Sequence, residues 1–235
     1  MKILFIHPNI PGQYKHLARY FSNQPENQVV FITKPSKKTV PNAQIVEYSV
    51  NRAANAKTHR YVRGLETAVY TGQAVWRACR TLKEKEGFVP DIICAHPGWG
   101  DALFVKDIYP DTPLLNFLEF YYRAFGADVH FDPNDEVDAD TVARVRIKNA
   151  NNLLNLEACD WGISPTNWQK SVHPKEFHSK ISVIHDGIDT DTITPGQPTN
   201  LHLPHGLVLS HNDEIITYVA RNFEPYRGFP TVMRA

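Results

Sequence analysis

The segment KILFIHPNIPGQYKHLARYF, residues 2–21, decides the expected fold. It opens with a short apolar run that ends in a polar loop, which is typical of a buried parallel strand. The residues after the loop place Leu17, Tyr20 and Phe21 at helical spacing. The chain is therefore expected to begin with a strand, a loop and a helix.

The same order recurs along the chain. Residues 91–110, DIICAHPGWGDALFVKDIYP, repeat the strand, loop and helix, and Asp101 stands where it would cap the helix. Further strands are expected within residues 27–33, 43–50, 112–122, 160–165 and 180–189, and helices within 61–86, 138–158 and 166–172. Strands separated by helical crossovers indicate a parallel sheet covered on both faces. The expected fold class is α/β, a doubly wound, Rossmann-like parallel sheet.

The character of the sequence changes after Asp189. Residues 190–213 are rich in Pro, Thr, Asn and His and show little periodicity, as in an interdomain linker. Residues 214–235 contain the apolar run IITYVA, expected to form a strand, and then the start of a helix near Phe229. We expect an N-terminal domain over 1–189 and the first elements of a truncated second domain over 214–235, which is too short to bury a core of its own.

Composition narrows the function classes. Basic and acidic residues number 25 each, so the chain has no net positive charge that would favour binding to nucleic acid or to an anionic membrane. The three cysteines lack metal-ligand spacing, and no apolar stretch is long enough for a signal peptide core or a membrane span. These features favour a cytoplasmic protein that binds no nucleic acid, and they leave open a peripheral contact with the inner membrane face.

The loop after the first strand is one candidate site. Gly12 precedes a helix whose free backbone N–H groups and dipole favour a phosphate or a sugar oxygen. A single glycine is not a dinucleotide fingerprint, so an ordinary strand-to-helix turn is an equal alternative. His7 and His16 lie nearby and are interpreted as surface or capping residues.

The stretch CAHPGWGD, residues 94–101, is a second candidate site. His96 lies at the carboxyl end of an interior strand, where open α/β sheets hold their ligands. Gly98 and Gly100 allow a ligand to approach the backbone, and the indole of Trp99 can pack on a sugar face. Glu119 is an acid near another strand end, and since no second carboxylate is evident beside it, a glycoside hydrolase is disfavoured.

The closing stretch is a third candidate site. Arg221 follows the expected strand, and Arg227 precedes a helix start at Gly228. Two guanidiniums and a helix N-terminus that converge on one anion would suit a diphosphate. Two solvated arginines are the alternative. The three sites together indicate one ligand held between two domains.

Two stretches carry a resemblance to a known family. Residues 163–195, ISPTNWQKSVHPKEFHSKISVIHDGIDTDTITP, and residues 216–229, ITYVARNFEPYRGF, resemble the interdomain signature of the family 4 glycosyltransferases, which are retaining enzymes of the GT-B fold. The resemblance implies that Gly12 lies under the donor phosphate or the acceptor and that His96 contacts the transferred sugar. It also implies that Arg221 and Arg227 hold the donor diphosphate.

Three departures from the family pattern stand out. Arg227 occupies a position where lysine is usual, and a planar fork grips phosphate differently from a point charge. The first loop has Gly12 in place of paired glycines. The Glu-x7-Glu motif of the second domain, which addresses the donor sugar and ribose, is absent from these residues.

The resemblance implies a reaction with defined partners. A sugar passes from a UDP- or GDP-linked donor to a glycan or lipid-linked acceptor, with retention at the anomeric carbon and with neither a cofactor nor a metal ion. His96 is the expected catalytic residue, and Trp99, Gly98 and Glu119 are expected to bind the sugar or acceptor. LEFYYRAFGADVHFDP, residues 118–133, is similar to a bacterial branch that handles envelope polysaccharides.

Two other classes remain open from the sequence. One is a glycan- or nucleotide-binding module without catalysis. The other is a flavodoxin-like nucleotide or flavin binder, which would hold its ligand with residues 1–190 alone. We expect no tight nucleotide binding by a chain that ends at Asp189, because the predicted diphosphate contacts lie after the linker.

Overall fold

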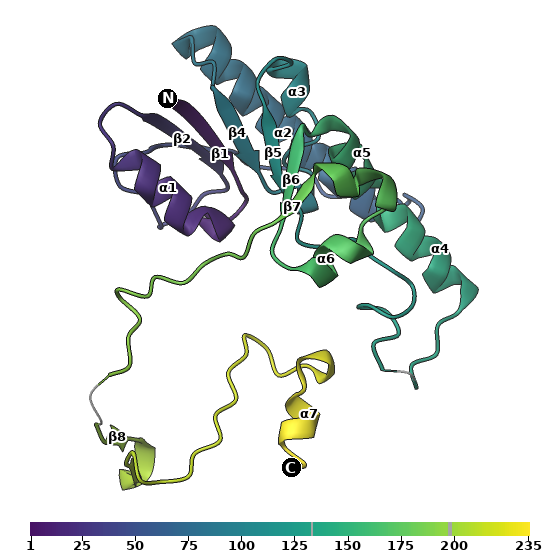
Figure 1. Cartoon of the computed structure of the whole chain (residues 1–235). Helices are drawn as coiled ribbons and strands as arrows, with labels where there is room; N and C mark the ends of the chain where they lie inside the picture. Colours follow the sequence, from purple (N-terminus) through teal and green to yellow (C-terminus); the bar gives the residue numbers. More distant parts are fainter. Residues whose placement is uncertain (133, 197–198) are drawn as a thin grey trace. The chain divides into compact units, whose positions relative to one another are not determined.

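Seven strands pair in parallel into one sheet, in the order β3-β2-β1-β4-β5-β6-β7 (Figure 1). The strands are β1 (Lys2–Ile6), β2 (Gln28–Thr33), β3 (Gln44–Glu47), β4 (Ile92–Ala95), β5 (Leu114–Phe117), β6 (Trp161–Ser164) and β7 (Ile181–Val183). Because the strand order reverses between β1 and β4, the sheet is doubly wound, and the expected fold class is confirmed.

The computed structural model describes residues 1–132, 134–196 and 199–235. They fall into two units, Met1–Asp186 and Gly187–Ala235, and the sheet belongs to the first. Position 133, in the stretch similar to the bacterial branch, and positions 197–198, in the expected linker, lie outside the described residues. The domain boundaries expected at residues 189 and 213 stay predictions.

Helices cover both faces of the sheet (Figure 1). They are α1 (Lys15–Ser22), α2 (Arg63–Glu86), α3 (Val105–Ile108), α4 (Ala139–Lys148), α5 (Ala150–Ala158) and α6 (Asn167–Val172), with 3-10 turns η1 (Gly12–Tyr14), η2 (Pro97–Trp99) and η3 (Lys175–Lys180). The apolar run of β1 is continuous because residues on both faces of this strand are buried. Leu4 and Ile6 pack with α2 and α3, whereas Ile3 and Phe5 pack on the α1 face, so both sides of the pleat are buried.

The long helix expected over residues 138–158 is wrong in one respect, because it breaks into α4 and α5 at Asn149. The Asn149 side chain is buried and binds the backbone of Tyr122 in both directions. Its Oδ1 accepts from the Tyr122 N–H at 3.0 Å, and its Nδ2 donates to the Tyr122 carbonyl at 2.7 Å. The side chain of asparagine often binds backbone groups in place of the regular helical hydrogen bonds, which interrupts a helix. Here these bonds fix the segment after β5.

The expected helix cap at Asp101 is also wrong. Asp101 is fully buried and accepts a hydrogen bond from the hydroxyl of Tyr48, while α3 begins only at Val105 with no side-chain cap. Burial raises the pKa of the Asp101 carboxyl. The side chain therefore links the segment after β3 to the turn after β4, and it does not serve a helix end.

The second unit holds little regular structure. It contains the antiparallel pair β8 (Leu201–His202) and β9 (Val208–Leu209), the turns η4 (Pro204–Gly206) and η5 (Pro225–Arg227), and α7 (Phe229–Val232). The helix expected near Phe229 is present as α7. The strand expected from the run IITYVA is not formed, because a strand needs a hydrogen-bonded neighbour and no described segment of this unit pairs with it.

None of the helices in the described ranges combines the length and the apolar character that crossing a membrane requires.

Candidate active site

The crevice at the carboxyl ends of β1 and β4 gathers most of the candidate side chains. Ile6 is paired with Ala95 in the sheet, so the next residues, His7 and His96, lie side by side with ring centroids 5.2 Å apart. The strand order reverses between these two strands. Open α/β sheets bind ligands at such a switch point, so the fold itself selects this crevice as the candidate site.

Both ring nitrogens of His96 are engaged. Nδ1 accepts a hydrogen bond from the backbone N–H of Gly98 at 3.2 Å, and Nε2 lies 3.2 Å from Oε2 of Glu119. Since Nδ1 is an acceptor, the proton of the neutral ring sits on Nε2 and is donated to the carboxylate. The His96 ring is therefore fixed in one orientation and one tautomer, as a group that must address a ligand atom requires.

Glu119 follows β5 and stays half exposed beside His96. The hydrogen bond from His96 holds the pKa of this carboxyl below its usual value, so Glu119 is ionised at neutral pH. The amide of Gln13 also reaches Oε2, at 3.5 Å. Within the described ranges Oε1 has no hydrogen-bond partner, which leaves one carboxylate oxygen free to accept from a ligand hydroxyl.

His7 lies beside His96 in the crevice, and its interpretation as a surface residue is wrong. The ring is buried, and its Nδ1 accepts from the backbone N–H of Asn9 at 2.9 Å. The chain then turns back over the ring at Gly12, whose φ is +54°. A Cβ on Gly12 would lie 2.6 Å from the ring carbons of His7, so glycine is required by contact as well as by conformation. His16, by contrast, is exposed on α1.

The buried ring of His7 predicts a pH dependence of stability. Burial, and then the neighbouring His96, lowers the pKa of His7 to about 4. The unfolded chain, with an ordinary histidine pKa near 6.5, therefore binds this proton more tightly than the folded chain. Stability is fully present above about pH 6.5 and is lost as the pH falls toward 4. We expect the free energy of unfolding to fall by about 2 kcal/mol between pH 7.5 and 5.

Urea denaturation at the two pH values measures this loss. His7→Gln should remove most of it, and the remainder reports His173, whose pKa burial also lowers. If His7→Gln kept the full pH dependence, the burial of a neutral His7 would be contradicted.

Trp99 forms the exposed wall of the site. Its ring centroid lies 4.6 Å from that of His96 and 5.6 Å from that of His7, yet the side chain is 44% exposed. Gly98 and Trp99 line two hollows. One, of about 100 Å³, includes His96 and Glu119, and the other, of about 700 Å³, extends to α2 and α4. The His7 ring meets the indole edge-on, at 71°, and the His96 ring lies tilted against it, at 31°; the exposed part of the indole can pack against a sugar ring.

Asparagines of α5 hold the loops of the site, and the sequence reading missed them. Asn151 Nδ2 donates to the carbonyl of Pro97 at 2.8 Å, and Asn152 Nδ2 donates to the carbonyl of Phe120 at 3.4 Å. Both side chains are buried. The signal was the run NANN at residues 149–152, because asparagine is unfavourable inside a helix unless its amide has a partner.

Arg221 and Arg227 lie in the second unit. Arg227 Nε donates to Glu224 Oε2 at 2.8 Å, whereas Arg221 is exposed and has no ion pair or hydrogen bond with any described residue. Gly228 follows in the left-handed conformation, with φ of +78°, and α7 begins after it. The predicted convergence of these two arginines with His96 on one ligand stays a prediction.

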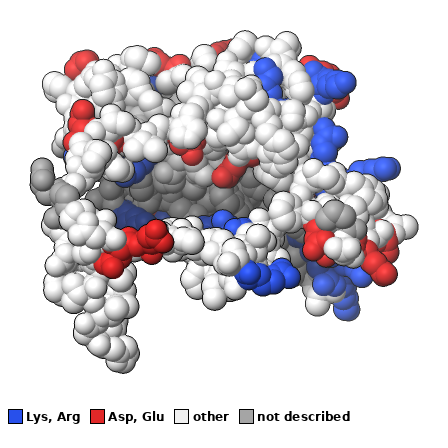
Figure 2. All heavy atoms as spheres, turned by 60° about the horizontal axis from the view of Figure 1, so that its bottom comes forward, with Lys and Arg blue, Asp and Glu red and all other residues white. Residues whose placement is uncertain are grey.

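Charges of both signs are interspersed over the face shown in Figure 2, with Lys and Arg in blue and Asp and Glu in red. This matches the zero net charge of the chain. An excess of positive charge can therefore arise only locally, where the residues that line one hollow are mainly Lys and Arg. Among the described residues, no group of three or more His, Cys, Asp or Glu side chains gathers as metal ligands would.

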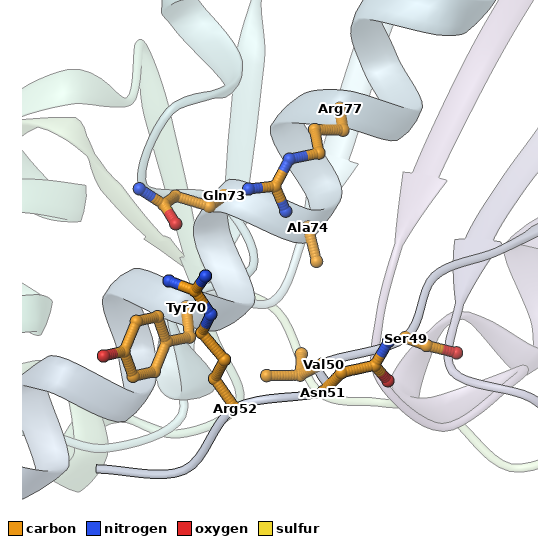
Figure 3. A pocket seen from close by; sticks show the side chains of 8 residues that line it. All are labelled: Ser49, Val50, Asn51, Arg52, Tyr70, Gln73, Ala74 and Arg77. Atoms are coloured by element: carbon orange, nitrogen blue, oxygen red, sulfur yellow. The ribbon is translucent and has the colours of Figure 1, made fainter. Parts of the chain in front are cut away.

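A separate hollow of about 250 Å³ lies between α2 and the segment after β3 (Figure 3). Arg52 and Arg77 extend over it from its two sides, with Gln73 between them. Both arginines are exposed, and it shares no lining residue with the two hollows beside Trp99. It is therefore distinct from the candidate site.

Comparison with known families decides the assignment. A family model described as "Glycosyl transferase family 4 group" matches residues 25–193. The chain belongs to this family. The match confirms the resemblance seen in residues 163–195 and extends it over the strands from β2 to β7. No curated protein matches the sequence of this family member at a significant level.

A solved structure shares the fold of this glycosyl transferase family 4 chain, and a second is matched more distantly. A UDP-glucose: anthocyanidin 3-O-glucosyltransferase in complex with UDP matches with a TM-score of 0.50 and 12% identity, over 84% of this chain and 55% of that one. A UDP-N-acetylglucosamine 2-epimerase from Listeria monocytogenes matches with a TM-score of 0.45 and 16% identity, over 77% and 44%. The chain thus spans about half the length of these structures.

Proposed function

We propose that this protein is a retaining glycosyltransferase of bacterial polysaccharide biosynthesis. It transfers a sugar from a UDP- or GDP-linked donor to a glycan or lipid-linked acceptor. The observation that carries the proposal is the fixed group of His96, Glu119 and Trp99 at the switch point of a family 4 sheet. The described residues supply the acceptor side and, in the second unit, the first donor contacts.

The acceptor side offers complementary groups for a sugar. The Trp99 indole packs on the apolar face of the ring. Oε1 of Glu119 accepts from a sugar hydroxyl, and the His96 Nε2–H, now bonded to Glu119, can be shared with a ligand oxygen. Because Gly98 and Asn151 fix the imidazole and its loop before a ligand arrives, little ordering is needed on binding.

The donor side needs positive charge. As the glycosidic bond lengthens, the leaving diphosphate gathers negative charge, so fixed cations stabilise the transition state more than the ground state. We assign this role to Arg221 and Arg227, with no metal ion required. Gly12 contributes backbone. Neither η1 nor α1 has a side-chain cap, and since the Tyr14 N–H already donates to the Pro11 carbonyl, we assign the N–H groups of Gly12 and Gln13 to a phosphate or sugar oxygen.

We place the protein in the cytoplasm, where nucleotide-sugars are made, with peripheral contact at the inner membrane face if the acceptor is lipid-linked. Its three cysteines are buried and form no disulfide, which suits a reducing compartment.

A transfer assay with His96→Ala tests the role of the site. In the protein encoded by the complete reading frame, we expect kcat/KM for sugar transfer to fall about 30-fold, close to 2 kcal/mol, the loss of a hydrogen bond that involves a charged group. Product formation from UDP- and GDP-sugars is followed by chromatography, and the anomeric configuration is read by NMR.

His202→Ala is the matched control, since His202 is exposed on β8 and lines neither of the hollows beside Trp99. Unchanged transfer by His96→Ala, or inversion at the anomeric carbon, would contradict the proposed function.

A further inference from the structure

We propose that the acceptor carries a negatively charged group, a phosphate or a carboxylate, and that Arg144 and Lys148 of α4 bind it beside Trp99. This inference rests on the proposed function for its acceptor, but it concerns a different part of the crevice. It names the substrate class that the larger hollow selects.

The hollow is large and continuous with the candidate site. Its volume is about 700 Å³, which is within the range of small-molecule sites. Gly98, Trp99, Tyr122 and Asn152 line it and also line the hollow of His96 and Glu119. A ligand whose sugar lies on Trp99 therefore has room to extend toward α2 and α4.

Its lining is cationic. Lys34, Arg60, Arg144 and Lys148 face one lining carboxylate, that of Asp128. Arg60 is neutralised by an ion pair with Asp140, which also accepts from the hydroxyl of Tyr61. The other three positive charges outnumber the single negative charge of Asp128 in the lining. In a chain with no net charge, this local excess favours an anion in the hollow.

Arg144 and Lys148 are the pair best placed to bind that anion. They stand four residues apart on α4, where side chains lie on the same helix face and like charges destabilise a helix. Arg144 makes no ion pair or hydrogen bond with the described residues, although its charge acts on the carboxylate of Asp138 at the start of α4. The Lys148 ammonium lies 3.5 Å from the ring centroid of Tyr122, which carries the cation to the wall shared by both hollows. An anion between the two side chains would relieve their repulsion.

An NMR titration of this chain tests the proposal, followed at the indole resonance of Trp99. The probes are a disaccharide ending in glucuronate, its uncharged methyl ester, and inorganic pyrophosphate. We expect an anionic probe to shift the resonance, and its affinity to fall about tenfold in the double variant Arg144→Gln, Lys148→Gln. Shifts with glucuronate assign a carboxylate acceptor, and shifts with pyrophosphate alone assign a diphosphate.

The matched control is Arg77→Gln, an exposed guanidinium of the separate hollow in Figure 3. It should leave the affinity unchanged. Both substituted sites are exposed, so the variants should fold, and their amide spectra check this. The proposal is overturned if the ester binds as tightly as the acid, if the double variant binds normally, or if no probe shifts Trp99. Anion binding without sugar transfer by the encoded protein would refute the proposed function and the acceptor assignment, and would leave only the anion site at Arg144 and Lys148.

Discussion

Arg221→Ala is expected to lower kcat for sugar transfer about 10²- to 10³-fold in the protein encoded by the complete reading frame. The guanidinium is exposed and unpaired within the described residues, so its full charge is available to the diphosphate that leaves. An interaction that strengthens as charge develops acts on kcat more than on KM. Steady-state kinetics with the identified donor, at fixed ionic strength, measures the effect.

Two variants sharpen this prediction. Arg227→Lys should keep most of the activity, because the resemblance places lysine there in the family and Arg227 already shares its charge with Glu224. Arg234→Ala is the matched control, an exposed arginine that donates only to the carbonyl of Pro230 among the described residues. Equal losses at Arg221 and Arg234 would show a general charge effect and would remove Arg221 from the donor site.

Gly100→Ala is expected to lower the free energy of unfolding by about 3 to 5 kcal/mol, through left-handed strain and overpacking together. Gly100 has φ of +91°, and a Cβ there would lie 2.2 Å from the carbonyl oxygen of Ala68 in α2. The three atoms nearest to this Cβ all belong to the backbone of Ala68, so the contact cannot be relieved by moving a side chain. Either α2 or the turn after β4 must shift, and both line the crevice.

Urea denaturation of Gly87→Ala separates the two causes. Gly87 also has a positive φ, +62°, but a Cβ there meets nothing within 4 Å. Its substitution should cost only about 1 kcal/mol, the strain of the backbone conformation alone. Equal losses at the two positions would contradict the close packing of α2 against the turn that carries Trp99.

The fold could be predicted because its local signals agree. The apolar runs of β1, β2 and β4 and the helical spacing of α1 and α2 each point to a parallel sheet buried on both faces. Where expectations failed, a long-range contact decided. Asn149 ends α4 because its side chain binds the backbone of Tyr122. Asp101 does not cap a helix because its carboxylate binds the hydroxyl of Tyr48, 53 positions away in sequence. Such partners are invisible to periodicity.

The candidate site was partly predictable for the same reason. His96 was recognisable from its place at a strand end, and the structure puts Glu119 and Trp99 beside it. His7 was missed because its burial depends on the return of the chain at Gly12. The roles of these residues, and of Arg221 and Arg227, stay predictions that the experiments above address.

Calorimetry of nucleotide binding tests the central claim most directly. UDP, GDP and ADP are titrated into a chain that ends at Asp189, which keeps the whole first unit, and into the protein encoded by the complete reading frame. The glycosyltransferase account predicts that the longer protein binds one of the nucleotides and that the chain ending at Asp189 binds none tightly, because Arg221 and Arg227 are missing. Equal binding by both would contradict it and would favour a nucleotide-binding module.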